Sequence, residues 1–219
     1  MWSPTATRRW WTRCMPSPTT EGAAGDTQAA ARFDAVIFGA GFAGLAMGRQ
    51  LKQAGIENFA ILDRAAGVGG VWRANTYPGA ACDVPSQLYS YSFFLNPDWS
   101  RKYSPQPEIL AYLERAAQAF ELDDHLHFRQ TVTGLKFYPG QGLWKLKLAS
   151  GRILEARVVV SAVGQLAEPA WPDIKDSQAF KGPLIHSAQW NGDVDVTGQR
   201  VAVIGNAASA VQLLPAMAE

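Results

Sequence analysis

The sequence predicts an α/β protein built on a Rossmann-type nucleotide-binding unit, and three observations support this fold. Residues 35–38 form a short apolar run that ends at a glycine, which is typical of a buried parallel strand. Residues 43–53 then show the spacing of a helix that packs on a sheet, and Ala54-Gly55 ends it. Residues 59–62 form a second apolar run, with Asp63 directly after it. This order of strand, turn, helix and strand predicts the start of a parallel sheet.

Composition excludes several classes of protein. The chain has 219 residues, 47% of them hydrophobic and 18% charged, with a net charge of +1. We therefore expect no nucleic-acid partner, and because no apolar run approaches the ~18 residues of a membrane span, no membrane partner either. Two cysteines, Cys14 and Cys82, exclude a disulfide scaffold and a four-cysteine zinc site. We expect a cytoplasmic protein without a metal, and interpret His125 and His127 as a solvated pair.

The remaining elements follow from periodicity and from turn residues. A loop as long as 67–105 inside a compact domain is usually functional. Beyond it we expect, in order, a helix that begins near Pro107, a hairpin made of 132–137 and 143–148, a strand over 153–160, an irregular connection over 165–195, a strand over 201–204 and a helix over 208–218.

A glycine motif lies between the first strand and the first helix. Gly39, Gly41 and Gly44 fit the pattern G-x-G-x-x-G. The first glycine permits the tight turn, the second lets the backbone approach a pyrophosphate, and the third lets helix and strand pack closely. Asp63 lies 19 residues after Gly44, where its carboxylate can bind a ribose. The motif predicts dinucleotide binding but does not separate FAD from NAD.

Two longer segments carry a resemblance to a known family. Residues 69–73, 77–86 and 89–93 together resemble the flavin-binding segment of Baeyer–Villiger monooxygenases. The run from Phe180 to Trp190 matches the family fingerprint F-x-G-x-x-x-H-x-x-x-W, although Asn191 stands where Pro or Asp usually follows. Trp190 favours this branch over the N-hydroxylating monooxygenases, which usually carry Phe there. Within the branch, the chain looks most like the hydroxyacetophenone-type enzymes.

A second nucleotide motif lies near the end of the chain. Residues 205–210 resemble the family's NADPH-binding pattern G-x-G-x-S-A, with Gly205 and Ser209 in place. Ala207 replaces the middle glycine, and its methyl group could crowd a pyrophosphate.

The resemblance implies a set of site residues. It implies that FAD binds through its pyrophosphate at Gly39, Gly41 and Gly44 and through its ribose at Asp63. It also implies that the adenine meets the main chain of Val132. The residues it places around the flavin are Gly70, Val71, Trp72, Asp83 and Tyr89. Asp83 would also stand beside the reacting groups and is the one catalytic candidate. Two alternatives stay open: Trp72, Tyr89 and Tyr91 as plain aromatic core, and Asp83 as a turn cap.

The expected organisation has four parts. These are a disordered or mis-called N-terminal tail over 1–30, an FAD-binding domain with an inserted β-hairpin over 31–165 that is incomplete at its C-terminal side, a linker with the fingerprint over 166–197, and the first strand and helix of an NADPH-binding Rossmann-type domain over 198–219. One strand and one helix cannot bury a sheet, so we expect the N-terminal portion of a longer protein.

The family implies an enzyme that uses NADPH, FAD and O₂ to convert a ketone to an ester or lactone. We expect this chain alone to be inactive. Two alternatives are a non-catalytic FAD-binding fragment and an N-hydroxylating monooxygenase. The apolar side chains of the last helix, Val211, Leu213, Leu214 and Met217, have no later strands to cover them. We therefore expect that segment to be mobile or to self-associate.

Overall fold

The computed structural model describes residues 30–190, 192 and 194–218, so most of the expected tail over 1–30 lies outside the described residues. The helices are α2 (Phe42–Gln53), α3 (Val71–Ala74), α4 (Gln106–Ala119) and α5 (Ala208–Ala218), with short 3-10 turns at Asp123–His125, Ser177–Ala179 and Ser187–Gln189. The strands are β1 (Ala31–Phe38), β2 (Phe59–Leu62), β3 (Leu126–His127), β4 (Val132–Tyr138), β5 (Leu143–Leu148) and β6 (Ile153–Ser161).

These strands form a single mixed sheet. Its order is β3-β2-β1-β6-β5-β4, and β1, β2, β3 and β6 are mutually parallel where they pair. The expected hairpin is present as the antiparallel pair β4–β5, which joins β6. Val36 pairs with Ala60 on one side and with Val159 on the other, which places β1 in the middle of the parallel part. The predicted α/β fold with an inserted hairpin is confirmed.

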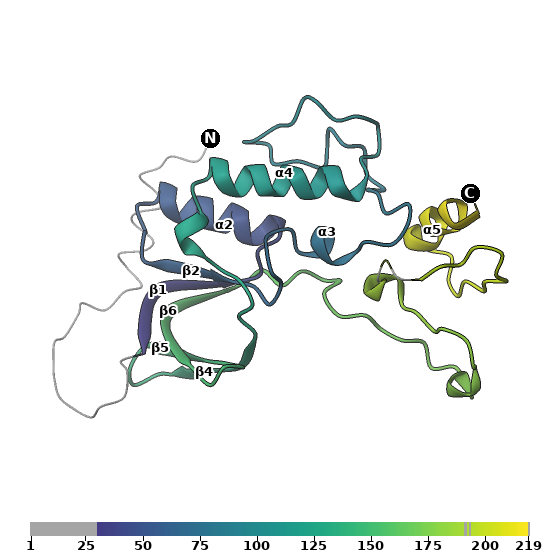
Figure 1. The fold of residues 1–219 in the computed structure, drawn as a ribbon. Helices are drawn as coiled ribbons and strands as arrows, with labels where there is room; N and C mark the ends of the chain where they lie inside the picture. The colour runs from purple at the N-terminus through teal and green to yellow at the C-terminus, as the bar shows by residue number, and fades with distance from the viewer. Residues whose placement is uncertain (1–29, 191, 193, 219) are drawn as a thin grey trace.

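Each face of the sheet has its own core. Helices α2 and α4 cover one face, and the curled hairpin lies below the other (Figure 1). Ile37 belongs to the helix-side core and Val36 to the hairpin-side core, and both are fully buried. Successive residues of a strand point to opposite faces, so an unbroken apolar run is what a strand covered on both sides requires.

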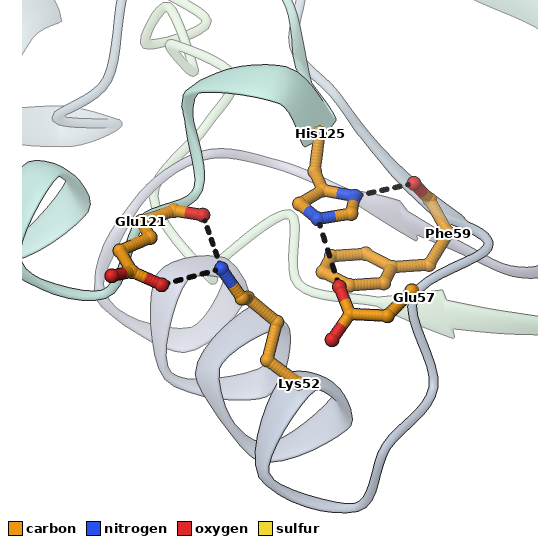
Figure 2. Close-up of polar contacts among 5 residues, drawn as sticks. All are labelled: Lys52, Glu57, Phe59, Glu121 and His125. Atoms are coloured by element: carbon orange, nitrogen blue, oxygen red, sulfur yellow. Dashed lines mark hydrogen bonds and ion pairs between the residues drawn. The ribbon is translucent and has the colours of Figure 1, made fainter.

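Polar contacts tie the segment that follows α4 to the end of α2 and, separately, to the start of β2 (Figure 2). Lys52 Nζ donates to the backbone oxygen of Glu121 at 2.8 Å and pairs with its carboxylate at 3.1 Å. His125 lies 3.9 Å from the ring of Phe59 in a parallel stack, and its Nδ1 is 3.1 Å from the Phe59 carbonyl oxygen. Its Nε2 is 3.7 Å from Glu57. The interpretation of His125 as a solvated residue is therefore wrong, because its ring stacks on Phe59 and its side chain is only 13% exposed.

The C-terminal part differs from the expectation first in its strand. The helix over 208–218 is present as α5, but residues 201–204 form no strand within the described part of the chain. A strand exists through ladder hydrogen bonds with a neighbour, and the described residues offer this run no partner. Val201 and Ile204 are 49% and 67% exposed. The apolar run alone indicated a buried strand. Without a neighbouring strand to pair with, the same residues remain irregular.

Helix α5 is not uncovered, which corrects a second expectation. Leu213 is buried against Tyr77 and Ala80, and Met217 packs at the edge of the same cluster. Val211 and Leu214 stay exposed as expected. In Figure 1 the helix lies beside the chain that follows α3. Self-association through the exposed side remains a prediction.

The helices of the described residues are short. The longest of them, α4, has 14 residues, whereas crossing a bilayer takes about 20. No helix in the described part is long and apolar enough for such a span. Nor do the described residues contain a group of three or more His, Cys, Asp or Glu side chains arranged to hold a metal ion.

Candidate functional site

The first glycine turn lies where three parallel strands end. The amide of Gly39 donates to Leu62 O at 2.8 Å, and the amide of Ala162 donates to Phe38 O at 2.8 Å. Gly39 has φ +101°, and a β-carbon there would overlap the carbonyl oxygen of Ala162. Only glycine fits this position, because both its backbone angle and the close neighbouring chain exclude a side chain. The carboxyl ends of parallel strands are where open α/β sheets bind ligands.

The start of α2 is free to bind an anion. Gly41 is the N-cap, no side chain caps the helix, and its first turn contains no acidic residue. The first backbone N–H groups of a helix have no partner inside the helix, and the helix dipole adds positive potential there. The arrangement therefore suits a phosphate group.

Asp63 closes one end of this turn. Its Oδ2 accepts from the amide of Ala40 at 2.7 Å and its Oδ1 accepts from the amide of Ala65 at 2.8 Å. Each carboxylate oxygen keeps a second lone pair, so a ribose hydroxyl can still donate to it. The backbone of Asp63 in turn accepts from the amide of Gln130 at 2.9 Å, which brings the chain leading into β4 and Val132 to the same place.

A second glycine loop faces the first. The amide of Gly69 donates to Ala40 O at 2.9 Å. A β-carbon on Gly70 would lie 3.2 Å from Gly41 Cα, and one on Gly41 would lie 3.6 Å from Gly70 Cα. Val71 follows directly and begins α3, a four-residue helix that the sequence did not predict. The two loops thus form a cradle in which Gly41 and Gly70 face each other backbone to backbone, and this shape fits the pyrophosphate of a dinucleotide.

Aromatic side chains stand at the α3 end of the cradle. Trp72 Nε1 donates to Tyr89 Oη at 3.0 Å, and the two rings meet edge to face with 5.5 Å between centroids. The ring of Phe42, from the first turn of α2, lies 5.1 Å from that of Tyr89. Burial raises the pKa of Tyr89, and the charge of Asp83 adds to this rise. Tyr89 therefore stays protonated, and its own O–H proton remains available to a ligand.

Asp83 lies near this aromatic group but is exposed. Neighbouring Cys82 is buried; burial raises the pKa of its thiol, which keeps it protonated. The amide of Cys82 donates to Ser104 O at 2.9 Å, and this contact fixes the backbone just before Asp83. A carboxylate on a fixed backbone at the edge of the aromatic group can place a negative charge beside a bound ring.

The sequence did not reveal the polar residues that support this loop. The side chain of Gln106 donates to Trp72 O, and the backbone N–H of the same residue donates to Ala80 O at 2.8 Å. Ser86 and Ser104 are both 1% exposed, and their hydroxyls are 2.6 Å apart. Buried polar side chains inside a loop give no periodic signal, so only the folded chain identifies them.

The second motif lies apart from the first. Gly205 has φ +113° and is exposed, and Ser209 lies half-buried in the first turn of α5. No contact in the described part of the chain joins either residue to the first glycine turn. The structure therefore brings together Gly39, Gly41, Gly44, Asp63, Gly70, Val71, Trp72, Tyr89, Asp83 and the segment before Val132, but not Gly205 and Ser209.

Comparison with known proteins identifies the family. A family model described as pyridine nucleotide-disulphide oxidoreductase matches residues 36–218. A Baeyer–Villiger monooxygenase of Streptomyces coelicolor is 48% identical over 83% of this chain and 35% of its own length. One from Pseudomonas aeruginosa is 46% identical over 86% of this chain and 36% of its own. The chain thus spans about a third of the length of these relatives.

The fold comparison gives the same result. The crystal structure of the OTEMO complex with FAD and NADP superimposes with a TM-score of 0.79 and 34% identity, over 86% of this chain and 37% of that one. The matched residues contain one cysteine, Cys82, so they cannot form a dithiol pair by themselves. The chain belongs to the pyridine nucleotide-disulphide oxidoreductase family and is a homologue of the Baeyer–Villiger monooxygenases.

Proposed function

We propose that this chain supplies the FAD site of a flavin-dependent Baeyer–Villiger monooxygenase. The observation that carries the proposal is the pair of facing glycine turns, closed by Asp63 at one end and by the Trp72–Tyr89 pair at the other. The names of the homologues support the reaction type, and the OTEMO complex with FAD and NADP supports the cofactors.

Each residue then has a binding or orienting role. The turns at Gly39–Gly44 and Gly69–Gly70 hold the pyrophosphate, Asp63 accepts from the ribose, and the main chain of Val132 meets the adenine. Val71, Trp72 and Tyr89 line the ring. Bound FAD, reduced by NADPH, supplies the oxygen-activating chemistry that converts a ketone to an ester or lactone. Asp83 sets the charge beside the reacting face.

The proposal also includes the organisation of the chain. Residues 31–165 form the FAD-binding domain, 166–197 the linker, and 198–219 the start of an NADPH-binding unit that uses Gly205 and Ser209. The partners are a small-molecule ketone and O₂, and the location is the cytoplasm. Oxygen insertion needs groups that hold the substrate, and the chain spans only about a third of the length of its relatives. We therefore expect the 219-residue chain to bind FAD but to form no ester by itself.

The test begins with FAD binding. Purified chain is titrated with FAD and followed by visible absorbance and by quenching of flavin fluorescence. We expect one FAD per chain, and we expect Gly41→Val to abolish loading because its side chain fills the cradle. Gly134→Ala is the matched control, since a β-carbon there has ordinary contact, 3.7 Å from Lys147 Cβ. Full loading of the Gly41→Val variant would overturn the proposed site.

The reaction type is tested separately. A longer protein that contains this chain is incubated with NADPH, O₂ and either ketones or amines, and products are separated by gas chromatography. Ester from ketones supports the proposal. Hydroxylated amine without ester supports an N-hydroxylating enzyme instead, and ester formation by the 219-residue chain alone would contradict the expectation that it is inactive.

A further inference from the structure

One side chain of α5 is hydrogen-bonded to the loop that leads to Asp83. Gln212 Nε2 donates to Ala81 O at 2.8 Å, and Gln212 Oε1 accepts from the amide of Ala81 at 3.3 Å. The same oxygen accepts from the hydroxyl of Tyr77 at 2.9 Å. The amide group of Gln212 therefore pairs with the two backbone groups of Ala81 much as a neighbouring strand would, across 131 residues of sequence.

The backbones meet closely at this contact. Gly79 has φ +75°, and a β-carbon there would overlap the carbonyl oxygen of Gln212 and lie 3.0 Å from Ala216 Cβ. Leu213, the next residue of α5, is only 7% exposed against Tyr77 and Ala80. The close approach at Gly79 and the burial of Leu213, next to Gln212, show that α5 and the loop pack closely and do not share only a surface hydrogen bond.

The loop is held from its other side by the FAD-binding domain. The backbone N–H of Gln106, at the start of α4, donates to Ala80 O at 2.8 Å, and the backbone N–H of Cys82 donates to Ser104 O. Residues 80–82 thus lie between two elements that are far apart in sequence. Asp83 follows directly, so the place of its carboxylate depends on both attachments.

We propose that Gln212 is a positioning residue for the proposed reaction: its amide fixes the peptide of Ala81 and, through it, the placement of Asp83 at the flavin side of the site. Gln212 touches neither the ring nor the substrate. It links the unit that carries the second nucleotide motif to the loop that faces the first. What the loop faces rests on the proposed function, whereas the attachment of the loop by Gln212 does not.

The attachment is tested by amide hydrogen exchange of the full 219-residue chain. Gln212→Met keeps the length of the side chain but removes all three hydrogen bonds. We expect the protection of the Ala81 amide to fall about tenfold, the effect of losing a hydrogen bond of ordinary net strength. Val211→Ala, one position away on the exposed side of α5, is the matched control and should leave Ala81 unchanged. Unchanged protection of Ala81 in Gln212→Met would overturn the proposal.

A second variant guards against a general loss of the helix. Tyr77→Phe removes one hydrogen bond to Gln212 and leaves α5 untouched, so its effect on Ala81 should be smaller than that of Gln212→Met but above that of the control. Equal protection in Tyr77→Phe and the control would contradict the role of the Gln212 amide. Loss of protection throughout α5 in Gln212→Met, with Tyr77→Phe silent, would also overturn it.

The positioning role has its own readout. The FAD-loaded chain is measured by visible circular dichroism, which reports the surroundings of the flavin ring. We expect the flavin bands to shift in Gln212→Met and to be unchanged in Val211→Ala. Lost protection at Ala81 with unchanged flavin bands would refute the positioning role. If no variant or wild-type chain binds FAD, the proposed function fails, while the exchange experiment still decides the attachment.

Discussion

Gly41 and Gly70 face each other with no side chain between them, and a β-carbon on Gly70 would lie 3.2 Å from Gly41 Cα. The two glycines differ in backbone angle. Gly41 has φ −87°, which any residue can adopt, whereas Gly70 has φ 54°. The same added methyl group therefore has different consequences at the two positions.

Gly41→Ala should keep the fold but lose the cofactor. Its methyl group would make ordinary contact with Gly70 at 3.6 Å, so only the preference of the N-cap position for glycine over alanine acts, and we expect a loss of less than about 1 kcal/mol in the free energy of unfolding. The methyl group occupies the path of the pyrophosphate, so the Kd for FAD should rise about tenfold or more. Gly70→Ala should instead lose about 1–3 kcal/mol of stability, because φ 54° with ψ −125° is a backbone conformation that residues with a side chain rarely adopt. Urea unfolding and FAD titration of both variants check this, and equal effects would contradict it.

Gly44 and Gly48 on α2 provide a second matched pair. A β-carbon on Gly44 would overlap the backbone oxygen of Gly39, which cannot move without opening the turn. A β-carbon on Gly48 would lie 2.8 Å from Ile61 Cδ1, the free end of a side chain. Alanine gains about 1 kcal/mol of helix propensity over glycine, which offsets the milder clash only. We expect Gly44→Ala to lose at least about 3 kcal/mol and Gly48→Ala about 1 kcal/mol or less in urea unfolding. The reverse order would show that the turn is more flexible than its contacts imply.

Tyr112 should stabilise the turn over residues 91–94 through its hydroxyl. That group accepts from the amide of Tyr91 at 2.8 Å and donates to Phe94 O at 2.7 Å, in a fully buried side chain. Tyr112→Phe leaves both backbone groups without a partner, so we expect a loss of about 1–3 kcal/mol in chemical unfolding. Tyr103→Phe, at a residue 43% exposed, is the control and should be neutral. A neutral Tyr112→Phe would show that water replaces the hydroxyl.

In Figure 2, Lys52 contacts Glu121 in two ways, through the carbonyl oxygen and through the carboxylate. Two variants can separate the effects of these contacts. Glu121→Gln removes only an exposed ion pair, because the backbone oxygen of residue 121 still accepts from Lys52, so it should cost less than about 0.5 kcal/mol. Lys52→Met removes both contacts at a helix end and should cost about 1 kcal/mol. Thermal unfolding of both variants measures the difference. Equal losses would show that the carboxylate, not the carbonyl, carries the contact.

His127 should make stability fall in mild acid. Burial, followed by the charges of Arg152 and His125, lowers the pKa of its ring below the usual value near 6.5. The unfolded chain therefore binds the proton first, and this contribution to stability is present above about pH 6.5 and is lost below it. His127→Gln should reduce the drop in unfolding midpoint between pH 7.5 and 5.5, and Arg152→Gln should reduce it partly. An unchanged drop in both variants would refute the assignment.

The sequence predicted β1, β2, β6 and the hairpin because their cause is local. An apolar run that ends in Gly39, and the alternation of Leu146 and Leu148 with Lys145 and Lys147, are direct consequences of burial on two faces or on one. The clustering of Gly39, Gly41 and Gly44 with Asp63 followed from spacing, since neighbouring parallel strands end at the same edge. For the loop over 67–105, only the resemblance indicated which residues face the site.

What the sequence missed depends on long-range contacts. The support that Gln106 and Ser104 give the loop, and the docking of α5 through Gln212, join residues far apart in the chain and leave no periodic signal. The prediction of a strand over 201–204 was wrong because it also depends on a long-range contact. An apolar run is necessary for a buried strand, but a hydrogen-bonding neighbour is also needed. The helix that follows needs none, because its backbone is satisfied internally.

The two outer strands of the described sheet offer poor templates for the addition of a foreign strand. One edge is β3, which has only two residues, and the other is β4, whose register shifts between Val132 and Gly134 and which carries exposed Lys136. A foreign strand adds best to a long, flat and uncharged edge. The short strand offers too few free backbone groups, and the bulge and the lysine disturb the other template. Exposed Leu135 and Phe137 can therefore remain on β4 without making it a nucleus for cross-β stacking.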